Sequence, residues 1–536
     1  MKTSKIFNLF ALAVAFTAVS CTGDFLDRNT NPEQAYEEHM KHDGLAIGGP
    51  FSQMTKNVSA AYQMGASEYG SDRYQVIQDL AGNIFSGYTG ATNSGFTQNN
   101  LYNITAGGWS KGMFEDVYER LVTQAVNVEP LRESFPSEVA LVDIVKVAGL
   151  HRVTDSYGPI PYSVIYDEEQ VLARPYDSQE QVYRGMFKDL DNAIETLQNQ
   201  ALGGGMLLAD YDDVFYGDVA KWVKFANTLR LRLAMHVVYA DEALAFEEAE
   251  KSINNPVGLM TEAGDATYLH PGAGAWQYPL YTIQYDFNNG DSAVGATIET
   301  YMNSFGDPRR EKLFTKVSDG ARDYIGVRNG VTNGSDYKLK VSRVLCDQTS
   351  PMLWMAPAEA YFLKAEYWLR KGDEGQAKTA YEEGVKVAFA TVGAAGADEY
   401  LASTATVGGY TDPVGNNSYE NALSGTPVVW SGASSFENHL EQIITQKYIA
   451  MFPEGQEAWT EYRRTGYPNI IPVKQNNSGG TINTNLQVRR LPYPSSEYQA
   501  NATNVAAAVT LLAGEAKSGS ADNGGTRLWW DKNPRF

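Results

Sequence analysis

Residues 358–388 read AEAYFLKAEYWLRKGDEGQAKTAYEEGVKVA, and this stretch decides the fold. Small and aromatic residues recur every three or four positions on both sides of a Gly-Asp turn at 372–373, which is the spacing of one helix face. The first face contains Ala358, Tyr361, Phe362, Ala365 and Leu369, and the second contains Ala377, Ala380, Tyr381, Gly384 and Ala388. The pattern therefore predicts two antiparallel helices that approach closely where the residues are small.

This helical pair resembles a tetratricopeptide repeat, and the same period recurs in earlier stretches. The repeated faces are Phe114, Val117, Tyr118, Leu121 and Ala125; Tyr183, Phe187, Leu190, Ile194 and Leu197; and Trp222, Phe225, Ala226, Leu229 and Leu233. Between the first two, Pro159 and Pro161 must end any helix because proline lacks an amide donor. Segments of about 265–350 and 390–435 show no such period and are rich in Gly, Asn, Tyr and Trp. We predict a mainly α protein in which tetratricopeptide-like helical pairs form a scaffold with long, irregular, aromatic-rich loop insertions.

The composition supports a folded protein that does not bind nucleic acid. The chain has 536 residues, of which 43% are hydrophobic and 12% aromatic, so it can build a large core. It carries 43 basic and 64 acidic residues, which gives a net charge of −21. Nucleic-acid binding depends on Lys and Arg neutralising phosphates, so this charge argues against such a partner.

The N-terminus has the pattern of an export signal. Lys2 and Lys5 precede a short apolar run that ends in small residues just before Cys21. The run is shorter than the ~20 residues that a membrane-spanning helix needs. The junction resembles the bacterial lipoprotein box, so we expect residues 1–20 to be removed and Cys21 to be lipidated. Cys346, the other cysteine, is then left without a disulfide partner.

Motifs for catalysis or metal binding are weak in this sequence. A G-x-S-x-G match at 108–112 lacks a convincing preceding strand, so we interpret Ser110 as a helix cap rather than a nucleophile. His39 and His42 lack the further ligands of a zinc site, and His236 fits a packed core position. The acidic run at 210–213 suits either a calcium ligand set or a helix-capping loop. We therefore expect no catalytic residue, no cofactor and no metal.

Two loop segments have the composition of a sugar-binding site. Tyr and Trp offer flat faces for sugar rings, and nearby Asn, Gln and Asp can bind the hydroxyl groups. The candidate ligand-binding residues are Tyr88, Phe96 and Tyr102 in the first segment, and Trp276, Tyr278, Tyr281 and Tyr285 in the second. The alternative is that these aromatic residues close the core beneath long loops.

The chain resembles the SusD/RagB family of outer-membrane nutrient-binding lipoproteins, through motifs that occur in a fixed order from end to end. These motifs lie at 25–27, 157–162, 222–235, 359–366, 446–452, 457–468 and 490–494. The resemblance implies a single SusD-like domain over residues 21–536, with the two irregular segments as inserted loop lobes.

The resemblance also implies a function without chemistry on the ligand. A family member is lipid-anchored to the outer membrane, faces outward, and delivers an oligosaccharide or peptide to a SusC-like TonB-dependent transporter. A glycan is the expected ligand, and a peptide is the alternative within the family. A secreted glycan hydrolase and a helical-repeat interaction scaffold are alternatives from other classes.

Overall fold

The computed structural model describes residues 44–60, 72–167, 173–272, 277–515 and 522–535. The described residues from 49 onward form one compact unit by their contacts. Residues 44–48 precede this unit and include the start of the first described helix.

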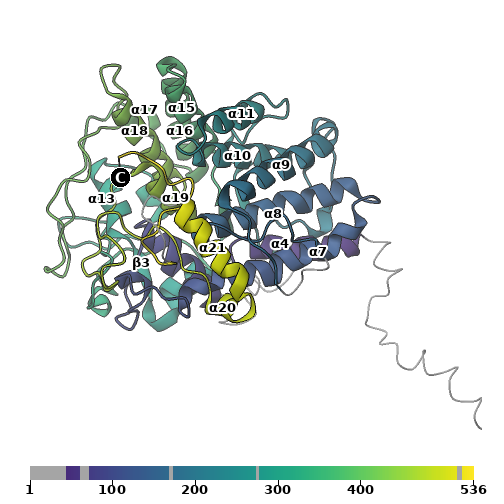
Figure 1. Ribbon diagram of the computed structural model, residues 1–536. Helices are drawn as coiled ribbons and strands as arrows, with labels where there is room; N and C mark the ends of the chain where they lie inside the picture. The colour runs from purple at the N-terminus through teal and green to yellow at the C-terminus, as the bar shows by residue number, and fades with distance from the viewer. Residues whose placement is uncertain (1–43, 61–71, 168–172, 273–276, 516–521, 536) are drawn as a thin grey trace, which may run out of the picture. The chain divides into compact units, whose positions relative to one another are not determined.

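The described chain is mainly helical, as predicted (Figure 1). Its first half contains α4 (Leu45–Asn57), α6 (Gly112–Asp116), α7 (Thr123–Val128), α8 (Pro136–Tyr157), α9 (Gln179–Leu202), α10 (Val219–His236) and α11 (Glu242–Ile253). Its second half contains α12 (Pro279–Tyr281), α13 (Ala296–Ser304), α14 (Arg310–Leu313), α15 (Ala358–Arg370), α16 (Glu374–Val392), α17 (Ala397–Leu401), α18 (Phe436–Ala450), α19 (Gly455–Thr465), α20 (Ser495–Ala500) and α21 (Ala502–Glu515). The π-helix η4 (Val117–Val122) joins α6 to α7, and the π-helix η1 (Gln75–Asn83) precedes them.

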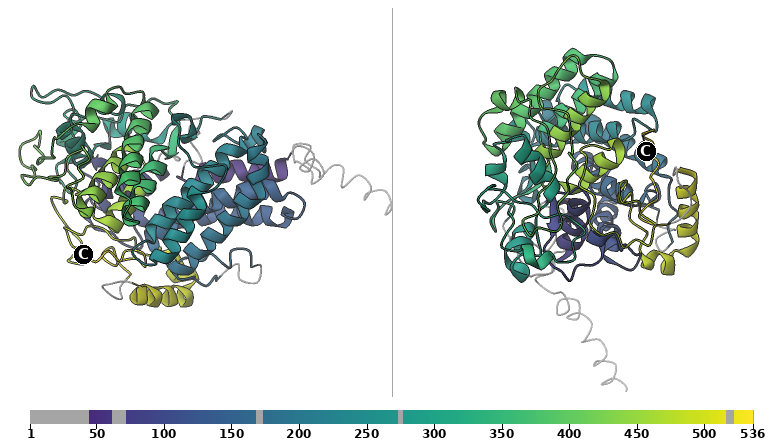
Figure 2. Two further views of the ribbon diagram at one scale, coloured as in Figure 1. Left: turned by 90° about the horizontal axis from the view of Figure 1, so that it is seen from above. Right: turned by 90° about the vertical axis from the view of Figure 1, so that its left-hand side faces the viewer.

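Consecutive helices pack side by side to form the scaffold. Contacts run from α8 to α9, from α9 to α10 and from α10 to α11, and Figure 2 shows these helices lying alongside one another. α10 also contacts α15, which packs on α16 and α18. The helix starts follow local sequence, since Ser178, Asp218 and Asp373 each accept a hydrogen bond from a backbone amide of the first turn.

The predicted helical pair at 358–388 is confirmed as α15 and α16. Its small residues lie at the helix contact, where Ala365 and Ala377 are fully buried. A Cβ atom at Gly384 would lie 2.8 Å from the ring of Phe362, so this position requires glycine for close packing. The turn passes through Gly372, whose φ of +78° is unfavourable for other residues.

A buried ion-pair network joins four helices at the centre of the scaffold. Arg232 of α10 pairs with Glu359 of α15 at 2.6 Å, and Lys447 of α18 lies 3.0 Å from Glu457 of α19. We call this group the four-helix junction; its other members are His236, Glu366, Arg370, Glu461 and Arg464. Charges this deeply buried are tolerated only when they are paired. The network could not be predicted from the sequence, because its ion pairs join helices that are far apart along the chain.

The described chain has four short strands, and the segments expected to be irregular also contain helices. β1 (Thr89–Ala91) pairs with β3 (Ser292–Val294), and β2 (Thr267–Leu269) pairs with β4 (Met352–Met355), both antiparallel. Within the segment expected to be irregular lies α13, whose residues 296–302 are all buried. The polar residues Thr297, Glu299 and Thr300 are buried together with the apolar ones, so the sequence does not separate a buried face from an exposed face and shows no amphipathic period.

Candidate ligand-binding surface

The β1–β3 pair brings together the two loop segments that the sequence singled out separately. Gly90 lies opposite Ala293 in the pair. Beyond the strands, the amide of Thr92 donates to the carbonyl of Asp291 at 2.9 Å, and Asn93 Nδ2 donates to Asp291 Oδ1 at 2.8 Å. The segments at 88–102 and 277–291 are therefore neighbours.

A third segment, which the sequence analysis did not single out, joins these two. Ser335 hydrogen-bonds Ser94 through its hydroxyl at 3.0 Å, Lys338 donates to the carbonyl of Asn288, and Arg343 donates to the carbonyl of Asn289 at 3.0 Å. We call residues 92–96, 281–291 and 333–345 the three-loop surface.

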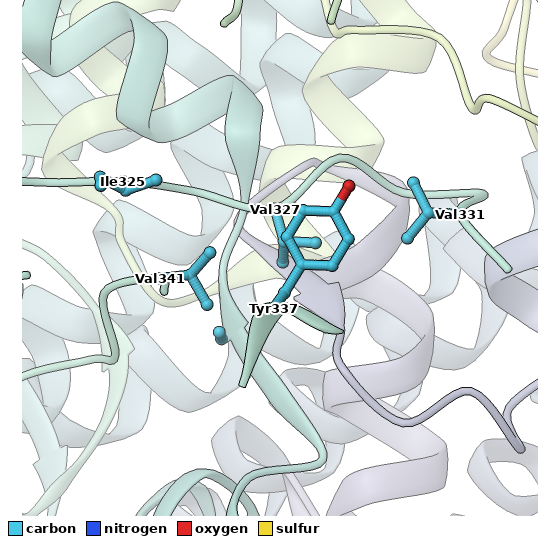
Figure 3. Close-up of a cluster of buried hydrophobic side chains, with 6 residues drawn as sticks. Ile325, Val327, Val331, Tyr337 and Val341 are labelled. Atoms are coloured by element: carbon cyan, nitrogen blue, oxygen red, sulfur yellow. The ribbon is translucent and has the colours of Figure 1, made fainter. Parts of the chain in front are cut away.

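A hydrophobic cluster lies next to the three-loop surface and includes two residues of its third segment. Figure 3 shows the Tyr337 ring beside Val327, with Ile325, Val331 and Val341 around them. The Tyr337 hydroxyl donates to Asp412 Oδ1 at 2.8 Å and accepts from Asn417 Nδ2 at 2.6 Å. Packing on one side of Tyr337 and hydrogen bonds on the other fix the third segment.

The turn at 288–291 is held by one buried carboxylate. Asn288, Asn289 and Gly290 have φ values of +49°, +61° and +102°, which asparagine and glycine adopt more readily than other residues. Asp291 is 2% exposed and accepts hydrogen bonds from Asn288 and from Gln75. Carboxylate-anchored turns of this kind place the outward side chains in defined positions.

Two of the predicted aromatic residues form an accessible stack on this surface. The rings of Tyr281 and Tyr285 are 4.8 Å apart with an interplanar angle of 16°, and both side chains are half-buried. The Arg343 guanidinium lies 5.1 Å from the Tyr285 ring centroid, and the Tyr285 hydroxyl donates to the carbonyl of Val344 at 2.7 Å. Tyr285 is thus fixed by both neighbours, which leaves Tyr281 as the less restrained ring of the pair.

Phe96 is the remaining accessible candidate of the first segment. It is half-buried and meets Trp109 edge to face at 5.2 Å. Trp109 and Arg343 were not among the ligand-binding residues predicted from the sequence. Neither residue belongs to a cluster of candidate residues along the chain. Only the folded structure shows that Trp109 lies beside Phe96 and that Arg343 lies beside Tyr285.

Three other predicted residues lie in the core instead. Tyr88, Tyr102 and Tyr278 are 0%, 1% and 4% exposed. The Tyr88 hydroxyl donates to the carbonyl of Tyr448, and the Tyr102 hydroxyl donates to Gln487 at 3.1 Å. Because burial removes their faces from solvent, these rings pack the core and cannot contact a ligand in this conformation. Trp276 and Cys21 lie outside the described residues.

The weak catalytic and calcium motifs have structural roles. Ser110 is 3% exposed and donates to the carbonyl of Thr105 at 2.9 Å, so it is neither a nucleophile nor the expected helix cap. Asp212 accepts bonds from the amides of Val214, Phe215 and Gly217 and from the Trp222 indole. Those four bonds order the loop before α10, but the residue that caps α10 is Asp218, which lies outside the acidic run.

His236, predicted as a core histidine, is fully buried and also charged. It could form a metal-binding cluster with Glu457 and Glu461, since their donor atoms lie within 4.8 Å of one another. Lys447 and Arg232, however, already lie 3.0 and 3.6 Å from Glu457. Burial alone would lower the His236 pKa, but the negative charges of Glu457 and Asp155 raise it to about 9. The cluster therefore forms an ion-pair network in this structure.

Comparisons with known proteins agree over nearly the whole chain. The SusD-like family model, described as Susd and RagB outer membrane lipoprotein, matches residues 27–531. A SusD homologue from Bacteroides uniformis is 36% identical, with a TM-score of 0.83, and the match covers 91% of this chain and 99% of that one. A chitin-binding SusD homologue from Flavobacterium johnsoniae is also 36% identical, with a TM-score of 0.83 and coverage of 91% and 100%. A comparison with curated proteins gave no match.

The fold is a helical scaffold that carries an accessible aromatic stack on its loops. Among the described residues, no helix combines the length and the apolar character that crossing a lipid bilayer requires. The chain belongs to the SusD-like family of outer-membrane lipoproteins.

Proposed function

We propose that this protein is a cell-surface lipoprotein that binds an oligosaccharide and delivers it to a SusC-like TonB-dependent transporter. The observation that carries the proposal is the half-buried Tyr281–Tyr285 stack beside a polar turn on the three-loop surface. A sugar ring can lie on such a stack while its hydroxyl groups meet Asn and Ser side chains. A relative described as chitin-binding supports a glycan as the ligand.

The binding proposal is tested by alanine substitution of Tyr281. Loss of one planar stacking partner costs about 1–3 kcal/mol in other systems, so Tyr281→Ala should weaken glycan binding roughly tenfold to hundredfold. Calorimetry with N-acetylglucosamine oligomers and with other polysaccharide fractions measures this. Tyr216→Ala, which removes a tyrosine that is 54% exposed and outside the surface, is the matched control.

The result also separates the competing functions. Full affinity in a combined Tyr281→Ala, Tyr285→Ala and Phe96→Ala variant that remains folded would exclude the three-loop surface as the glycan site. Release of new reducing ends by the parent protein would instead indicate a hydrolase. If the protein bound a peptide mixture and no glycan, the ligand would be a peptide, and the proposed role in transport would be unaffected.

The anchoring proposal rests on Cys21 and its neighbouring sequence. Lipid attachment at Cys21 would tether the protein, since buried acyl methylenes contribute ~0.8 kcal/mol each. Cys21→Ala should release the protein from the membrane fraction and remove the acyl mass from the mature chain. Unchanged membrane partitioning in this variant would exclude lipidation at Cys21.

The transporter proposal has a separate test. A gene for a large TonB-dependent transporter next to this one, together with co-purification of the two products from outer membranes, would support the partnership. Purification of the lipoprotein alone under mild detergent conditions, with such a transporter expressed, would contradict it.

A further inference from the structure

A hollow lies among the helices, apart from the three-loop surface. It measures about 640 Å³ and shares no lining residue with that surface. Its walls come from α6, η4 and α7 on one side and from α20 on another. Binding sites for small ligands typically measure 300–1,000 Å³ and combine an apolar wall with a few polar groups.

The wall of this hollow has that combination. Its apolar part is formed by Phe114, Val122, Val126, Pro161 and Ala500. Two of its carboxylates are already engaged by the protein, because Glu115 accepts from the Ser496 hydroxyl at 2.7 Å and Glu497 accepts from the Tyr176 hydroxyl at 2.6 Å. The Glu115–Ser496 bond connects α20 to α6 in the opposite wall of the hollow.

Arg174 differs from the other charged groups of the wall. Within the described part of the chain, its guanidinium makes no hydrogen bond and no ion pair, and its Nε is buried. Its backbone is nevertheless held in place, since Asn501 Nδ2 donates to the Arg174 carbonyl at 2.8 Å. A buried donor of a charged group without an acceptor is unfavourable, so this guanidinium is suited to an anion supplied from outside.

The remaining charges limit which anion fits. Arg73 is neutralised by Asp116, while Glu115, Glu119 and Glu497 give the wall negative charge. A doubly charged phosphate would be repelled by them. A ligand with one carboxylate can pair with the Arg174 guanidinium. Hydrogen-bond donors on the rest of that ligand can bind the acidic side chains of the wall.

We propose that this hollow is a second binding site, which takes a ligand ending in a carboxylate. The carboxylate pairs with Arg174, and the body of the ligand lies on Val126 and Ala500. Two sources have this chemistry, namely a glycan that ends in a uronate and a peptide that ends in a free carboxyl group. The site involves no covalent step.

The test uses two pairs of probes that differ only in the carboxylate. Calorimetry compares cellobiouronic acid with cellobiose, and Gly-Leu-Phe with its C-terminal amide. We expect at least one acid to bind roughly tenfold to hundredfold more tightly than its neutral partner, as for hydrogen bonds to a charged group. Arg174→Gln should abolish this preference, and Ala500→Trp should weaken binding by filling the hollow.

Controls separate this site from the three-loop surface. Tyr281→Ala should leave the preference for the acid unchanged, and so should Arg184→Gln, which removes an exposed arginine paired with Glu180. Thermal unfolding of each variant verifies that it is folded. The proposal is overturned if neither acid is preferred over its neutral partner, or if the preference persists in Arg174→Gln. A preference for cellobiouronic acid would identify the ligand as a glycan, and a preference for Gly-Leu-Phe would identify it as a peptide.

Discussion

The four-helix junction and the three-loop surface are both rich in polar side chains, but they use them differently. In the junction, carboxylates and cations are fully buried and paired with each other, as Arg464 is with Glu366 and Glu461. In the three-loop surface, the buried Asp291 carboxylate accepts hydrogen bonds from side-chain amides such as that of Asn93, while Tyr281 and Arg343 remain accessible. The difference shows that the charges of the junction serve the fold, whereas the polar groups of the loops are available to a ligand.

The largest effect is expected from breaking the junction. Arg464 donates to Glu366 at 2.6 and 2.7 Å and to Glu461 at 2.6 Å. Arg464→Met would leave two buried carboxylates without this partner, so we expect a loss of about 3–5 kcal/mol in the free energy of unfolding. Urea unfolding measures this loss.

The control for this variant is a surface pair. Arg535 and Glu437 are 40% and 44% exposed, so Arg535→Met should cost less than about 1 kcal/mol. Similar small losses in the two variants would contradict the structural role given to the junction.

A smaller, pH-dependent effect is expected from His236 within the same junction. Its pKa is raised from 6.5 to about 9 in the folded protein. The resulting stabilisation is therefore complete below the unfolded value of 6.5 and is lost as the pH rises through 9. At about 1.4 kcal/mol per pKa unit, the stability difference between the parent and His236→Gln should shrink by about 3 kcal/mol between pH 6 and pH 9.5.

His151 provides the comparison for that measurement. Burial, and then the charge of Arg232, lower its pKa to about 3, so it stays neutral throughout this pH range. The stability difference between the parent and His151→Gln should therefore be constant from pH 6 to pH 9.5. A constant difference for His236→Gln as well would show that His236 is not charged in the folded state.

The sequence predicted the helical scaffold well, because amphipathic spacing is a local property. The α15–α16 pair, the faces of α9 and α10, and the helix end before Pro159 all follow from neighbouring residues. The junction and α13 were missed for a common reason. Paired charges from distant helices, and a helix buried all round, leave no periodic signal along the chain.

The candidate site could be predicted only as two segments and not residue by residue. Composition identified the stretches that β1 and β3 bring together. It could not separate Tyr88 from Tyr281, because a buried tyrosine with a satisfied hydroxyl and an accessible tyrosine have the same sequence signature. Arg343 and Trp109 were missed because neither belongs to a cluster along the chain.

The smallest effects are expected from removing the hydroxyl group of Tyr88 or of Tyr281. These two variants test the distinction between a buried and an accessible tyrosine. Tyr88→Phe would leave the buried carbonyl of Tyr448 without its donor, so we expect a loss of about 1–3 kcal/mol in the free energy of unfolding. Tyr281→Phe removes a hydroxyl that makes no hydrogen bond among the described residues, and its ring remains stacked on Tyr285. Its stability should therefore stay within about 0.5 kcal/mol of the parent.

Binding measurements on the same two variants complete the comparison. Tyr88→Phe should keep the parent's glycan affinity under conditions where it is folded, because the Tyr88 side chain has no face open to solvent. Tyr281→Phe should also retain most of the affinity, since the flat face that stacks on a sugar is preserved, whereas Tyr281→Ala should not. If Tyr88→Phe weakened glycan binding without a loss of stability, the loop surface would have to open in solution and expose Tyr88 to the ligand.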